Sequence, residues 1–169
     1  MTATNQRDQV CRLAKSRPDL ALEKAREITE PWFRAQALAC VARHTAGKTV
    51  AIANEAARAA LLCDDAYKQT AVRAWEIAAL AEAGVVAEAS RRLRELVKAS
   101  AAVVPLASRA EALFLLLQAA ACLSSGDRQS VHQVLQQACA HDGHWRCQRA
   151  LRDAQRIENG EQAPRPFFQ

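Results

Sequence analysis

The densest group of side chains able to bind a metal ion lies near the C-terminal end of the sequence. Cys139, His141, His144 and Cys147 follow one another in the pattern C-x-H-x-x-H-x-x-C. Thiolate and imidazole are ligands that zinc prefers, and four such groups around one turn can form a tetrahedral site. The spacing is not that of a zinc finger, and two thiols can equally fill small gaps in a core beside two exposed histidines. Zinc binding is therefore an alternative, and we assign no metal ligand.

Nucleophilic catalysis needs a thiol or hydroxyl beside a base and an orienting carboxylate. The four histidines are dispersed along the chain, and no catalytic signature surrounds a serine or cysteine. Paired carboxylates such as Glu23 and Glu27 lie among Lys24 and Arg26, as on a solvated helix surface. We predict no catalytic and no cofactor-binding residue, so an uncharacterised enzyme is a further alternative and a non-enzymatic protein is favoured.

Two rows of basic side chains could bind a partner. The first row, within about a 120° wedge at about 100° per residue, consists of Arg146, Arg149, Arg152 and Arg156. The second consists of Arg91, Arg94 and Lys98. Such rows bind nucleic-acid phosphates or acidic proteins, but they also keep the last helix of an array soluble. These seven residues are the predicted partner-binding residues.

Composition predicts that helices position these side chains. Half of the 169 residues are apolar but only 5% are aromatic, so Ala, Leu and Val carry the apolar content, which favours helix. Apolar residues recur at helical spacing, while the alternating runs and Asn-Gly turns of strands are missing. We predict about nine helices, over residues 5–15, 19–28, 31–47, 49–62, 65–84, 85–98, 105–123, 130–140 and 144–158. Ser130 and Gln133 form the predicted capping box of the eighth helix.

A short pattern recurs along these helices. Arg34-Ala-Gln-Ala-Leu38 returns as Lys68-Gln-Thr-Ala-Val72, Arg109-Ala-Glu-Ala-Leu113 and, more loosely, Cys147-Gln-Arg-Ala-Leu151. The alanines at 37, 71, 112 and 150 are 34, 41 and 38 residues apart, which is the length of one two-helix repeat. The period predicts stacked helix pairs.

From about Arg17 to Ile157 this alternation resembles the tetratricopeptide-like and HEAT-like helical-repeat superfamilies. The resemblance concerns architecture and brings no site residues with it. It implies an all-α, right-handed α-α superhelix in residues 1–160, and a role as a protein-interaction scaffold.

The last residues, 161–169, have no helical period and contain Pro164 and Pro166. We predict a flexible C-terminal tail. Its Phe167-Phe168 pair has an alternative reading as a short motif that docks in a groove of this chain or of another protein.

These observations favour a non-enzymatic module that binds another protein or peptide through the groove of the helical array. Nucleic acid is the alternative partner, because the net charge of +5 and the pI near 9.1 permit an acidic one. No apolar run reaches the roughly 18 residues of a membrane helix and the N-terminus lacks a signal peptide, so we expect a cytoplasmic protein with no membrane contact. Open ends of such an array also make a homodimer an alternative.

Overall fold

The computed structural model describes residues 1–168, and within them every regular element is a helix. The elements are α1 (Ala3–Ala14), α2 (Pro18–Glu27), α3 (Pro31–Ala42), α4 (Thr49–Ala60), α5 (Ala66–Ala71), α6 (Arg73–Glu82), α7 (Val86–Ala99), the short 3-10 helix η1 (Ser100–Ala102), α8 (Leu106–Ala120), α9 (Ser125–Cys139) and α10 (Trp145–Glu158). The predicted all-α class is confirmed. The predicted helix over 65–84 is divided into α5 and α6 at Val72, whose carbonyl accepts a tight i+3 bond from the Trp75 N–H (3.2 Å).

The predicted start of α9 is wrong by five residues. The helix begins at Ser125, and the Ser124 side chain caps it by accepting a hydrogen bond from the Asp127 N–H (3.1 Å). The Ser124 hydroxyl in turn donates to the Asp127 carboxylate (2.8 Å), which lies in the first turn where negative charge is favourable. Ser124 supplies a cap earlier in the chain than Ser130, so Ser130 lies inside the helix and exposed to solvent.

Ser124→Ala is expected to lower the free energy of unfolding by about 1 kcal/mol, because the Asp127 N–H loses its side-chain acceptor. Ser130→Ala, six residues later on the exposed face of α9, is the matched control and should stay within about 0.5 kcal/mol of the wild type. Urea unfolding followed by circular dichroism measures both. Equal losses in the two variants would contradict this assignment of the cap.

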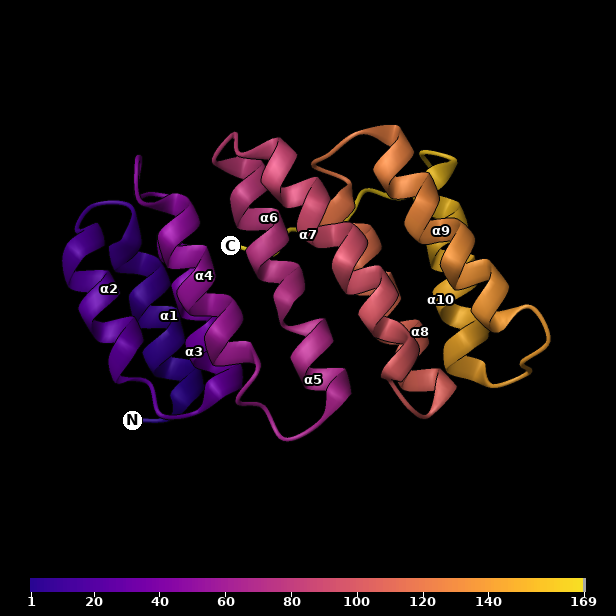
Figure 1. Cartoon of the computed structure of the whole chain (residues 1–169), viewed down its shortest axis with the longest axis horizontal. Helices are drawn as coiled ribbons and strands as arrows, with labels where there is room; N and C mark the ends of the chain where they lie inside the picture. The colour runs from indigo at the N-terminus through magenta and orange to yellow at the C-terminus, as the bar shows by residue number, and fades with distance from the viewer. Residues whose placement is uncertain (169) are drawn as a thin grey trace.

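The helices lie side by side in two rows, from α1 and α2 at one end to α9 and α10 at the other (Figure 1). Row A consists of α1, α3, α6, α8 and α10, each packed against the next. Row B consists of α2, α4, α7 and α9, and each packs against the row-A helix that precedes it. The array therefore buries one face of every helix against a neighbour, while the right-handed superhelix remains a prediction.

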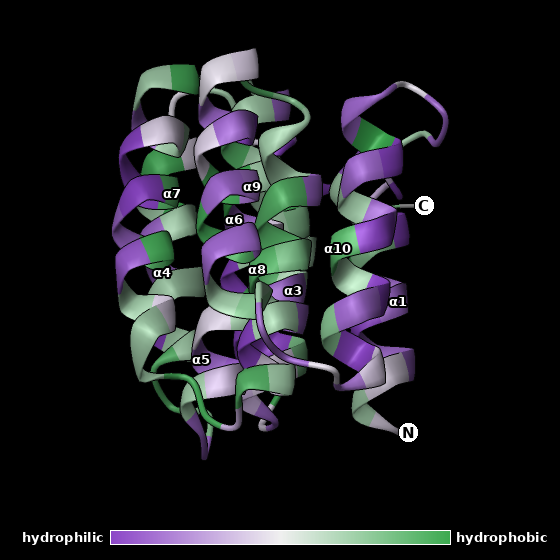
Figure 2. Ribbon diagram, turned by 90° about the vertical axis from the view of Figure 1, so that its right-hand side faces the viewer, coloured by the Kyte–Doolittle hydropathy of each residue, from purple (hydrophilic) through white to green (hydrophobic). Residues whose placement is uncertain are grey.

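Small residues form much of the core between the rows. Ala37, Ala71 and Ala112 are fully buried and Ala150 is 4% exposed, all on row-A helices or on α5, which leads into row A. In Figure 2, hydrophobic colour is concentrated on the central helices such as α8, whereas α4, α7, α1 and α10 show hydrophilic colour at the two sides. Alanine at the contacts lets neighbouring helices approach closely, which is what a row of packed helices needs.

The helix α8 is the most apolar, as predicted, and packs against α5, α6, α7, α9 and α10. Its Leu113, Leu116 and Leu117 side chains are fully buried. Across residues 1–168, none of the helices combines the length and the apolarity that crossing a bilayer requires.

Candidate functional site

The structure places the two predicted basic rows on different sides of the molecule. Arg91, Arg94 and Lys98 project from α7 in row B, and the other four residues lie on α10 in row A. In the end-on view of Figure 2, α7 and α10 stand on opposite sides of the array. A single phosphate backbone cannot follow both rows along one continuous surface.

Most of these basic side chains are already paired with carboxylates. Arg91 bonds to Glu88 (2.6 Å) and Glu95, and Arg94 lies 3.5 Å from Asp127. On α10, Arg149 (2.9 Å) and Arg146 (3.6 Å) share Glu111, and Arg152 contacts Asp153 (3.1 Å). Among the described residues only Lys98 and Arg156 of the seven have no ion pair. The surface therefore offers less free positive charge than the sequence suggests.

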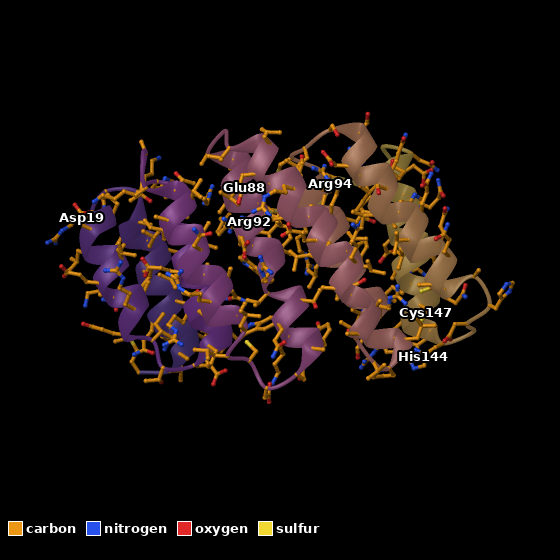
Figure 3. The ribbon with its side chains drawn as sticks, viewed as in Figure 1. Asp19, Glu88, Arg92, Arg94, His144 and Cys147 are labelled. Carbon is orange, nitrogen blue, oxygen red and sulfur yellow. The ribbon has the colours of Figure 1, made fainter. Side chains whose placement is uncertain are left out.

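Of the four candidate zinc ligands, only Cys139 and Cys147 come together. Cys139 and Cys147 are buried, whereas His141 and His144 are exposed. The His144 ring stacks on Trp145, and its Nδ1 accepts a hydrogen bond from the Arg146 N–H (3.2 Å). Figure 3 shows His144 and Cys147 at the lower edge of the array, near the start of α10. In the part of the chain that the structure covers, no three metal-ligating side chains come together.

Four of the six thiols, those of Cys40, Cys63, Cys139 and Cys147, are buried, whereas Cys11 is half-buried and Cys122 is exposed. Burial and a hydrogen bond with Cys147 raise the pKa of Cys139 to about 12, and burial raises the pKa of Cys63 and of Cys122. In the Cys11–Cys40 pair, the hydrogen bond raises the pKa of Cys11 and lowers that of Cys40, which is only 2% exposed. Because the thiolate is the reactive form, the raised pKa values make Cys11, Cys63, Cys122 and Cys139 poor nucleophiles, and burial keeps Cys40 from solvent.

A charged network lies inside the array between α4, α6 and α7. Glu76 is 1% exposed and accepts hydrogen bonds from Arg73 (2.9 Å) and from Arg92 (2.8 Å), which is 4% exposed. Arg92 also donates to Glu88 (2.7 Å) and to Asn54. Figure 3 shows Arg92 and Glu88 close together on α7, with Arg94 farther along the same helix. Since every charge in it is matched, the network joins three helices and offers no free group for chemistry.

Hydrogen bonds from Arg91 and Arg92 hold the pKa of Glu88 at about 2, below its ordinary value of 4.5. A carboxylate whose pKa is lowered by folding stabilises the fold above its unfolded pKa, and loses that contribution as the pH falls from about 4.5 towards 2. Arg91→Ala is expected to raise the pKa of Glu88 towards 4.5. Carboxyl NMR titration measures this directly, and the same midpoint in variant and wild type would contradict the pairing.

The C-terminal tail, expected to be a flexible extension, lies against row A as far as Phe168; Gln169 is outside the described residues. Gly160, with φ of 73°, ends α10, and the Glu161 N–H bonds back to the Arg156 carbonyl (2.9 Å). This is a Schellman motif, in which glycine takes the left-handed conformation at the helix end. It turns the chain back along the array, and in Figure 1 the yellow tail runs from α10 towards α6.

Three contacts hold this tail on the row-A helices. The Arg165 N–H donates to the Gln118 side chain on α8 (3.1 Å). The Phe167 ring packs edge-on against Trp75 on α6, with centroids 5.0 Å apart. The Phe168 ring lies 4.3 Å from the guanidinium of Arg43, which follows α3. Phe168 packs against both hydrophobic clusters of the core, so the tail joins the two halves of the array.

We call the surface beneath the tail the row-A groove, formed by Arg7, Cys11, Gln36, Arg43, Trp75 and Gln118. A pocket of about 530 Å³ lies at its α1 end, between Arg7, Cys11 and Gln36 and the tail itself. A second pocket, of about 440 Å³, lies on the other side of the tail between α5, α8 and α10, where Tyr67, Phe114 and Leu115 line it. The tail thus occupies the middle of a longer hollow surface.

The sequence predicts for the Phe167-Phe168 pair either a flexible tail or a motif that docks in a groove of this chain or of another protein, and the structure places it in a groove of its own chain. The groove residues themselves were not singled out, since Trp75, Arg43 and Gln118 have ordinary helical neighbours. Comparison of the chain with protein-family models, with curated proteins and with solved structures finds no match.

Proposed function

We propose that this protein is a non-enzymatic interaction module that binds a segment of another protein in the row-A groove. The observation that carries the proposal is the tail, an extended segment seated across α8, α6 and the end of α3 by two aromatic rings and a backbone N–H. A surface that holds one short extended segment has the shape and the polar groups to hold another. Pockets on both sides of the tail leave room for a longer one.

The helical-repeat resemblance supports the same proposal, because stacked helix pairs present an extended surface on one row. In this proposal the array is a right-handed superhelix, the two rows are its inner and outer layers, and the setting is cytoplasmic. Nucleic acid is the less supported partner, since the basic rows on α7 and α10 lie on opposite sides and are largely paired with carboxylates.

Site-specific photo-crosslinking in cells that make the protein tests the proposal. A photoreactive residue at Asp8 or Leu115, beside the two row-A pockets, is expected to capture partner proteins. The same residue at Arg58 or Arg94, on the exposed surface of row B, is the matched control and should capture none of them. Capture that is equal from both rows, or nucleic acid captured at Arg94, would overturn the proposal.

A further inference from the structure

The tail differs from the rest of the chain in having no helix of its own to support it. Pro164 and Pro166 each hold their own φ at about −65° and favour extended backbone at the residue before them, and neither has an N–H to satisfy. A segment that is already extended loses little conformational freedom on binding. The seated tail therefore shows what kind of segment the row-A groove accepts.

The groove has a specific place for the first aromatic ring. Phe167 meets Trp75 edge-on at 5.0 Å and 81°, and Trp75 meets Trp32 in the same manner at 6.0 Å and 68°. Edge-to-face pairs at this separation stabilise aromatic rings beyond the burial of apolar area. An aliphatic side chain at this position would keep the burial and lose the ring geometry.

The second ring is recognised by a charge. Arg43 lies 4.3 Å from the Phe168 centroid, and Glu82 holds the guanidinium through a hydrogen bond of 2.6 Å. A guanidinium over a ring face is attracted by the negative charge of that face. Because Arg43 is positioned by Glu82, it is ready to receive a flat ring, and the position selects an aromatic residue.

The groove also binds the backbone of the segment. Gln118 is 8% exposed, and its side-chain oxygen accepts the N–H of Arg165. This contact fixes the register of the segment. It places Phe167, two residues after Arg165, at Trp75, and Phe168, three residues after Arg165, at Arg43. A buried amide used in this way accepts any residue at the Arg165 position except proline, which has no backbone N–H.

Resting on the proposed function, we infer that the partner segment is an extended stretch in which a proline is followed by two aromatic residues, and that residues 161–168 compete with it for the row-A groove. The tail is tethered, so its effective concentration at the groove is about 1 mM. With an intrinsic Kd near 100 μM, such a tether weakens the binding of a second segment about tenfold. The tail thereby sets the affinity for the groove that a partner segment needs in order to displace it.

Binding of a fluorescent peptide with the sequence of residues 162–169 to full-length protein tests the inference. Phe167→Ala/Phe168→Ala empties both ring positions in the full chain, and this variant is expected to bind the peptide about tenfold more tightly than the wild type. A peptide with alanine at both aromatic positions should bind neither protein. No binding to the double variant, or equal binding to variant and wild type, would overturn the inference.

Two further variants keep the test independent of folding. Arg43→Gln, added to the double variant, should weaken peptide binding severalfold, whereas Arg58→Gln on row B should leave it unchanged. Should the double variant unfold, wild-type protein carrying fluorine-labelled phenylalanine serves instead. Excess peptide is then expected to shift the Phe167 resonance as the tail leaves Trp75, and a resonance that does not move would contradict competition.

The outcomes separate this inference from the proposed function. Partner capture from Asp8 or Leu115 without any effect of the peptide would leave the function standing and remove the aromatic-pair segment. Peptide binding without a captured partner would keep the specificity of the row-A groove for an aromatic pair and would remove the proposed function. A dimer that dissociates on Phe167→Ala/Phe168→Ala, seen by analytical ultracentrifugation, would assign the tail to a second copy and overturn the competition within one chain.

Discussion

Arg92→Ala is expected to lower the free energy of unfolding by about 3–5 kcal/mol, because it takes one partner from a buried ion pair. Glu76 is 1% exposed and would keep only Arg73, and Asn54 and Glu88 would lose their shared donor as well. The loss falls on the contact between α4, α6 and α7, at the middle of the array. Urea unfolding followed by circular dichroism measures it.

Arg91→Ala is the matched control, one residue away on the same helix. The Arg91 side chain is 50% exposed although it pairs with both Glu88 and Glu95. Surface pairs of this kind contribute about 0–1 kcal/mol, since water already solvates both charges. Equal losses for the two arginines would show that the network around Glu76 is not a closed, water-excluded unit.

Leu113→Ala is expected to lower the free energy of unfolding by about 2–5 kcal/mol. The side chain is 0% exposed on α8, in the cluster formed mainly by α6 to α10, and its removal leaves a cavity that the packed helices cannot close fully. Because folded domains are stable by only about 5–15 kcal/mol, either of these two substitutions removes a large part of the total.

Leu115→Ala, two residues along α8, is the matched control for Leu113→Ala. Leu115 is half-buried and lines the pocket beside α5 and α10, so water can occupy the space that it leaves. A clearly smaller loss of stability is expected, with changed binding of a partner on row A as its main effect. A loss as large as that of Leu113→Ala would place Leu115 in the core and remove it from the lining of the pocket between α5, α8 and α10.

The contact of Phe168 with both core clusters favours partner segments that carry aromatic rings. Phe168 packs against both core clusters, so a partner that displaces the tail removes a contact that joins the two halves of the array. A partner segment with two aromatic rings restores that contact, whereas one with aliphatic residues restores only part of it. Selectivity would then follow from the structure of the array as well as from the groove.

Local sequence alone predicted the helices and most of their boundaries. Apolar residues at helical spacing, with Pro31 at the start of α3, act within one turn of the chain and need no distant partner. The predicted end of that helix at Gly47 is wrong, since α3 stops at Ala42. The same local rule failed where two caps compete, since Ser124 and Ser130 both precede acceptable helix starts and the first one takes the role. The break between α5 and α6 at Val72 had no proline or glycine to reveal it.

The composition and the helical period by themselves determined that this protein is a set of amphipathic helices that must pack on one another, because each buries an apolar side that it cannot cover alone. Only the tertiary structure decided which charges meet and which surface stays hollow. Arg92 reads as one more basic residue of α7 until α6 brings Glu76 against it, and Phe167 reads as a tail residue until Trp75 lies beneath it. Such pairs join residues far apart in the chain, and their energy depends on burial and distance, which no local pattern contains.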